Sequence, residues 1–116
     1  LMVPRTLAAA EQLARDHGIE VEVIDLRSLV PLDTQTILGS VARTHRLFTV
    51  EENPRLCGWG AEIASIVADE AFYDLDGPVV RITTPHIPLP AADNLEDLAL
   101  PTAPRIVDKI RRSLNA

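Results

Sequence analysis

The chain has 116 residues, enough for one domain, and its 47% hydrophobic and 24% charged residues are ordinary for a packed protein and wrong for a disordered one. Its net charge of −6 argues against a nucleic-acid partner, because nucleic-acid readers carry a basic footprint. No apolar run approaches the about 20 residues that cross a bilayer, so no membrane partner is expected. The acidic balance fits either plain solubility or a basic protein partner.

Cysteine usage bears on the compartment. The single cysteine, Cys57, cannot form an internal disulfide, which fits a reducing environment. We therefore expect a cytoplasmic protein, or one of the mitochondrial matrix if the organism is a eukaryote.

Helical and strand patterns alternate along the whole chain. Gly18 follows the first helical pattern where a C-terminal cap belongs, and Asp33 precedes the second as an N-cap. The alternation predicts one three-layer α/β/α domain over 1–116, with a mostly parallel sheet. We expect helices near 4–17, 33–44, 59–73 and 104–114, and strands near 19–26, 46–51 and 78–83.

One strand is missing from this pattern, because the chain opens directly with a helix and three strands make a thin sheet. We expect a fragment of a longer polypeptide whose first strand precedes Leu1, and an unpaired sheet edge where that strand belongs. Residues 84–104 hold five prolines and little periodicity. This stretch is extended chain, and we expect its 84–101 portion to pack over other elements or over a subunit partner.

The loop from Glu51 to Gly60 leaves a strand end and enters a helix, the usual place for a ligand in a parallel sheet. Free amides near Gly58 and Gly60 could cradle an anion. The alternative is a tight loop that needs glycine for positive φ. Glu51 and Glu52 are neighbours on a strand and point opposite ways, so they form no acid–base pair.

Other reactive side chains show no catalytic arrangement. Cys57 is either a nucleophile beside a helix N-terminus or inert packing. His17, His45 and His86 lack metal-ligand spacing; His45 is expected to begin a strand. Trp59 is either an anchor into a partner or a lid over the sheet. We assign no catalytic, cofactor-binding or metal-ligating residue in this domain.

Several stretches together resemble the C-terminal domain of the transketolase family, and more narrowly the β subunits of thiamine-diphosphate-dependent 2-oxo acid dehydrogenases. The pyruvate and acetoin types are favoured by Pro85-His86-Ile87-Pro88. The similar stretches cover essentially the whole chain, in order: Gly18 to Asp33, Arg46 to Glu52, Gly58 to Ala64, Leu75 to Thr83, Pro85 to Pro90, Leu95 to Asp97 and Leu100-Pro101.

The resemblance implies an enzyme subunit, inactive alone, that assembles with an α subunit and a second β subunit. The parent enzyme would oxidatively decarboxylate a 2-oxo acid and transfer the acyl group to lipoyl. Its thiamine diphosphate and Mg²⁺ would bind outside this domain, which would contribute assembly and docking to the acyltransferase core.

The docking partner implied by the resemblance is a small basic domain of the acyltransferase. Asp74, Asp76 and the carboxylate of Ala116 are the expected contacts, although short acidic residues also simply favour turns. Two alternatives remain: a free-standing module that binds an anionic metabolite in the cleft around Glu51 and Gly58, and a transketolase or deoxyxylulose-phosphate synthase C-terminal domain.

Overall fold

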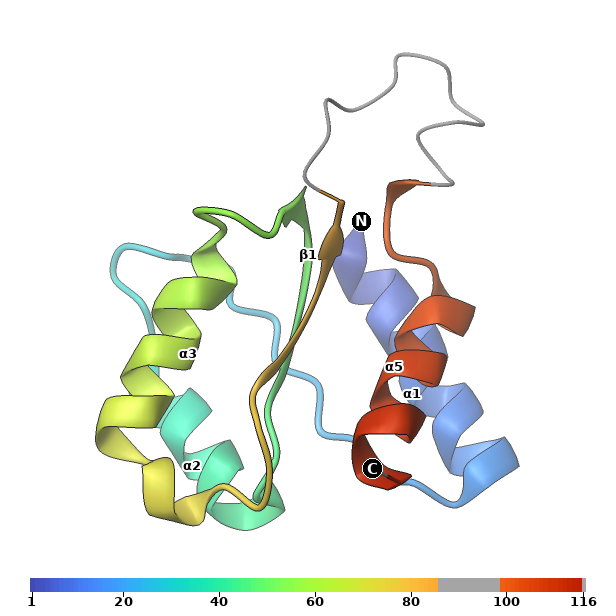
Figure 1. The fold of residues 1–116 in the computed structure, drawn as a ribbon, viewed down its shortest axis with the longest axis horizontal. Helices are drawn as coiled ribbons and strands as arrows, with labels where there is room; N and C mark the ends of the chain where they lie inside the picture. The colour runs from blue at the N-terminus through green and yellow to red at the C-terminus, as the bar shows by residue number, and fades with distance from the viewer. Residues whose placement is uncertain (86–98, 116) are drawn as a thin grey trace.

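The computed structural model describes residues 1–85 and 99–115 (Figure 1). Within them the chain forms an α/β domain with helices on both faces of a small parallel sheet. The elements in chain order are α1 (Met2–His17), α2 (Thr34–Thr44), β1 (Phe48–Pro54), α3 (Trp59–Glu70), the 3₁₀ turn η1 (Phe72–Asp74), β2 (Val80–Thr84) and α5 (Ala103–Asn115). Residues 86–98, which include His86 and most of the predicted proline-rich packing segment, lie outside the described residues, as does Ala116.

The described sheet has two parallel strands, β1 and β2. Phe48 pairs with Val80 and Val50 with Ile82, and the register shifts between Val50 and Pro54. Parallel strands need a crossover connection, and α3 with η1 supplies it. Both strands end at the same edge of the domain, close to the N-terminus of α1 (Figure 1).

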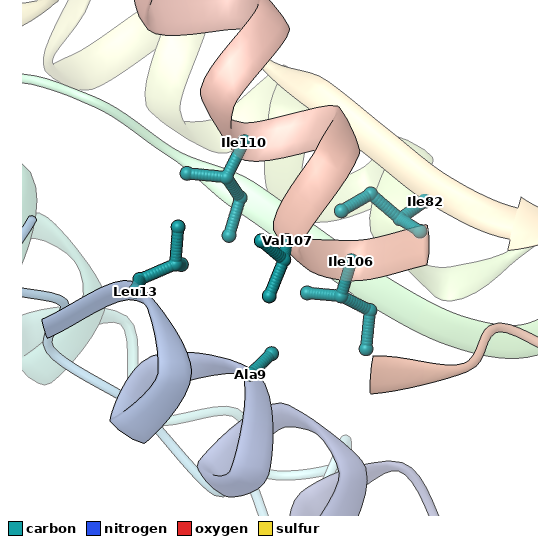
Figure 2. Close-up of a cluster of buried hydrophobic side chains, with 6 residues drawn as sticks. All are labelled: Ala9, Leu13, Ile82, Ile106, Val107 and Ile110. Atoms are coloured by element: carbon teal, nitrogen blue, oxygen red, sulfur yellow. The ribbon is translucent and has the colours of Figure 1, made fainter. Parts of the chain in front are cut away.

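Two apolar clusters cover the two faces of the sheet. On one face, α1 and α5 pack together over β2 (Figure 2), with the buried side chains Ala9, Leu13, Ile82, Ile106, Val107 and Ile110. On the other face, α2 and α3 bury Ile37, Val41, Ile63, Val67 and Ala71. Each fully buried aliphatic side chain contributes about 1.5–3 kcal/mol, so the strands are held mainly by these two helical layers.

The predicted caps are confirmed. Gly18 ends α1 in the left-handed conformation, with φ 66°. Asp33 caps α2, because its Oδ1 accepts from the Thr36 N–H at 3.1 Å and its Oδ2 from the Thr36 hydroxyl at 2.6 Å. These two hydrogen bonds hold the pKa of the Asp33 carboxyl below its usual value, and the bond from the Thr36 hydroxyl has the larger effect.

Three sequence expectations are wrong. Residues 19–26 form no strand in the structure, although their pattern is strand-like. His45 begins no strand, because it is the left-handed C-cap of α2, with φ 64°. The third helix stops at Glu70 instead of continuing to residue 73. Phe72, which follows it, is 60% exposed.

The last expectation for the sheet concerns its edges. In the described sheet of two strands, β1 and β2 each have one unpaired edge, so the expected gap for a strand before Leu1 stays a prediction. Among the described helices, none is both long enough and apolar enough to cross a membrane.

Candidate functional site

Glu51, at the carboxyl end of β1, is the most buried charged residue of the predicted loop region. Its side chain is 0% exposed and pairs with Arg81 of β2. The Arg81 Nη2 and Nε atoms donate to Glu51 Oε1 at 3.1 and 3.3 Å. A carboxylate buried this completely needs a charged partner, and Arg81 supplies it. Glu52 is exposed, as expected for its strand neighbour.

The glycines that open α3 lie directly against this carboxylate. A Cβ at Gly60 would collide with Glu51 Oε1 and stand 2.7 Å from Thr49 Oγ1, and a Cβ at Gly58 would collide with Glu51 Oε2. Gly58 has φ −72°, so the prediction of a glycine needed for positive φ is wrong there. Cys57 holds the positive φ instead, at 59°. Gly58 and Gly60 are therefore explained by the close approach of the helix to Glu51.

The same carboxylate decides what the loop can bind. A negative group already stands at the N-terminus of α3, where the helix dipole favours one. A second anion at this position would meet the Glu51 carboxylate instead of open amides. Neither Glu51 nor Gly58 lines the large cavity of the described domain. The metabolite cleft expected around these two residues is thus filled by the chain's own side chain.

The remaining candidates are scattered. Cys57 is exposed in the loop, and Trp59 packs against the α2–α3 cluster. His17 is exposed at the end of α1. Within residues 1–85 and 99–115, no three His, Cys, Asp or Glu side chains gather in a way that could hold a metal ion. These described residues therefore do not fit Mg²⁺, and the filled α3 N-terminus does not fit a diphosphate.

Asp74 and Asp76 lie together in an exposed turn between α3 and β2. Two bonds hold this turn to the end of α2: the Asp76 N–H donates to the His45 carbonyl at 2.8 Å, and His45 Nδ1 lies 2.8 Å from the Asp74 carbonyl. A carbonyl only accepts, so Nδ1 carries the proton. The two carboxylates therefore project from a turn with a fixed backbone.

Two exposed aromatic side chains directly precede Asp74 in the chain. The sequence pattern did not distinguish them from aromatic residues of the core. Phe72 and Tyr73 are 60% and 97% exposed and meet edge to face, with ring centroids 5.4 Å apart. Asp69 and Glu70 precede them and are also exposed. Because α3 ends at Glu70, Phe72 and Tyr73 lie in η1 rather than in the last turn of that helix. We call residues 69–76 the acidic turn.

Arg46 connects the acidic turn to the C-terminal helix. Its Nη1 donates to the Ser113 carbonyl at 3.4 Å. The same guanidinium lies against Gly77, where a Cβ would stand 2.6 Å from Nη1. The end of α5 and the acidic turn thus lie at one end of the domain, away from the carboxyl ends of the strands (Figure 1).

Comparison with known proteins assigns the chain to a family. Residues 1–106 match the family "Transketolase, C-terminal domain". The chain belongs to this family. The assignment confirms the resemblance and the α/β fold class.

The chain's relatives are β subunits. It is 45% identical over 113 residues to the pyruvate dehydrogenase E1 component subunit beta of Leifsonia xyli, covering 97% of this chain and 33% of that protein. It is 49% identical over 106 residues to the acetoin:2,6-dichlorophenolindophenol oxidoreductase subunit beta of Bacillus subtilis, covering 90% and 30%. The mitochondrial pyruvate dehydrogenase subunit beta of Saccharomyces cerevisiae is 44% identical over 111 residues, covering 95% and 30%. The chain spans about a third of the length of these relatives.

Proposed function

We propose that this transketolase C-terminal domain is part of the β subunit of a thiamine-diphosphate-dependent 2-oxo acid dehydrogenase of the pyruvate or acetoin type. The observation that carries the proposal is the identity of 44–49% to such β subunits over 90–97% of the chain. The parent enzyme would decarboxylate a 2-oxo acid oxidatively and pass the acyl group to lipoyl. Thiamine diphosphate and Mg²⁺ would bind to this parent enzyme outside the present domain. A bacterial parent would be cytoplasmic and a eukaryotic one would lie in the mitochondrial matrix.

Within that enzyme the domain assembles subunits and docks the acyltransferase core. Its partners would be the α subunit, a second β subunit and a small basic domain of the acyltransferase. The acidic turn supports the docking role, because Asp74 and Asp76 are exposed on a backbone that His45 fixes. A rigid turn loses little conformational entropy when a cation binds to it.

Binding of the isolated basic domain to the assembled enzyme tests this role. Asp76→Asn should weaken binding, and the loss should shrink as the salt concentration rises, because added ions screen charges in an exposed pair. Glu52→Gln is the matched control: it removes one exposed charge at the other end of β1 and should leave binding unchanged. Equal affinity of Asp76→Asn and the parent at low salt would place the docking surface elsewhere.

A further inference from the structure

The surface of the acidic turn is hollowed. An open hollow of about 340 Å³ lies along residues 68–74, from the last turn of α3 through η1. Three acidic and two aromatic residues are among those that line it: Asp69, Glu70, Asp74, Phe72 and Tyr73. We call it the aromatic hollow.

The two rings of the aromatic hollow keep free faces. Phe72 and Tyr73 are both exposed, and their ring planes meet at 82°. In an edge-to-face pair one ring directs its edge at the face of the other, so each ring retains at least one face that its neighbour does not cover. The face of an aromatic ring carries a partial negative charge and attracts cations. Exposed aromatic side chains of this kind serve as anchors in protein interfaces.

The charges beside the rings oppose the usual pattern of a helix end. A helix C-terminus carries a partial negative charge, so cations stabilise its last turn. The helices α1, α2 and α5 follow this pattern with Arg15, Arg43 and Arg112, whereas α3 has no basic residue in its last turn. It has Asp69 and Glu70 there instead. The end of α3 therefore joins two carboxylates to the negative end of the helix dipole.

No described cation neutralises these carboxylates. Among the residues that the structure describes, no ion pair involves Asp69, Glu70, Asp74 or Asp76. Negative groups gathered at this end of a helix repel one another and lower the stability of the free domain. A local arrangement that costs stability is expected where a surface serves binding.

The rings and the charges together define the chemistry of the occupant. A second copy of this face would bring four carboxylates against four, and an anionic lipid surface would be repelled in the same way. A neutral apolar ligand would bury the carboxylates without a partner. The guanidinium of arginine fits both features, because it stacks on a ring face while the N–H groups in its plane donate to carboxylates. Lysine has a compact, strongly hydrated ammonium group and no planar face to stack.

We propose that the aromatic hollow binds an arginine side chain of the basic domain that docks on the acidic turn. The guanidinium stacks on the Tyr73 ring and donates to the carboxylates at the end of α3. The proposal rests on the proposed function for the source of this arginine. The hollow adds selectivity for arginine over lysine, which exposed carboxylates such as Asp74 and Asp76 do not supply by charge alone.

A fluorine label on the Phe72 ring of the assembled enzyme tests the selectivity at the hollow itself. Titration with tetra-arginine should shift the fluorine NMR signal to saturation, at a lower peptide concentration than titration with tetra-lysine. Tyr73→Leu keeps an apolar side chain and removes the ring, so it should weaken tetra-arginine binding about 3- to 30-fold. Tyr73→Phe keeps the ring and should retain the affinity. Leu56→Ala, which removes an exposed apolar side chain from the β1–α3 loop, is the matched control and should change nothing.

The basic domain is then measured against the same variants. Tyr73→Leu should weaken its binding by a similar factor at every salt concentration, since the loss is one of stacking. One Arg→Lys replacement in the basic domain should weaken binding to the unaltered enzyme and leave binding to the Tyr73→Leu enzyme unchanged, because the two substitutions remove the same contact.

The outcomes separate this inference from the proposed function. If Tyr73→Leu alters neither the tetra-arginine titration nor the binding of the basic domain, the hollow is not an arginine site, even though docking itself stands. A fluorine shift that follows enzyme concentration in the absence of peptide would mean that a second copy occupies the hollow, and would also overturn the proposal. If the basic domain fails to bind the unaltered enzyme while the shift with tetra-arginine still depends on Tyr73, the docking function is wrong and the arginine site is supported.

Discussion

Replacing Gly60 with alanine should destabilise α3, although alanine is the better helix former. The new methyl group would overlap Glu51 Oε1 and stand 2.7 Å from Thr49 Oγ1 and 2.9 Å from Glu51 Cδ. Glu51 is fully buried and held by Arg81, so its carboxylate cannot move aside into water. Thr49 Oγ1 is itself buried without a hydrogen-bond partner in the described residues, so its neighbourhood offers no spare polar contact.

The two opposing free energies can be compared. Gly to Ala gains at most about 1 kcal/mol in helix propensity. Overpacking a rigid buried site costs about 1–3 kcal/mol, and the overlap with a fixed carboxylate puts Gly60 at the upper end of that range. The net loss is about 2 kcal/mol, which corresponds to an equilibrium constant for opening about 30-fold larger. Native-state hydrogen exchange at the α3 amides measures that opening directly.

Gly39→Ala is the matched control for this substitution. Gly39 lies inside α2, and a Cβ there meets only Arg43 Nη1, at an ordinary 3.5 Å. The propensity gain then acts alone, and Gly39→Ala should slow exchange in α2. If Gly60→Ala also slowed exchange in α3, the Glu51 carboxylate could not lie against Gly60.

Two further substitutions test the charged and capping groups. Arg81→Met should destabilise the domain by about 3–5 kcal/mol in urea denaturation, because it leaves Glu51 buried and unpaired. Arg43→Met, which breaks an exposed pair with Glu22, should have little effect. Equal destabilisation by the two substitutions would contradict the role of burial. Asp33→Ala should loosen α2 and reduce the acid sensitivity of the domain. The folded-state pKa of Asp33 is lowered, so its stabilisation is complete above the unfolded-state pKa and is lost as pH falls through the folded-state pKa. An unchanged dependence of stability on pH between neutral and acid conditions would refute this assignment.

Local chemistry was enough to predict the parts of the fold that depend on neighbours in sequence. The Gly18 and Asp33 caps are decided by backbone conformation and by a side chain three residues away, so a sequence pattern identifies them. The parallel pairing of β1 and β2 follows from the helix between them, because a crossover connection permits no antiparallel hairpin. The exposure of Asp74 and Asp76 follows from their place in a turn.

Only the tertiary structure decided the roles that depend on partners distant in sequence. No residue near Glu51 in the sequence shows that its carboxylate is buried and paired with Arg81. When that carboxylate is left out of account, Gly58 and Gly60 suggest an anion-binding loop. Residues 19–26 carry a strand pattern and yet form no strand, because a strand exists only through hydrogen bonds to a neighbour. A side-chain pattern specifies which faces are apolar; whether a partner lies along the backbone edge is settled by the rest of the fold.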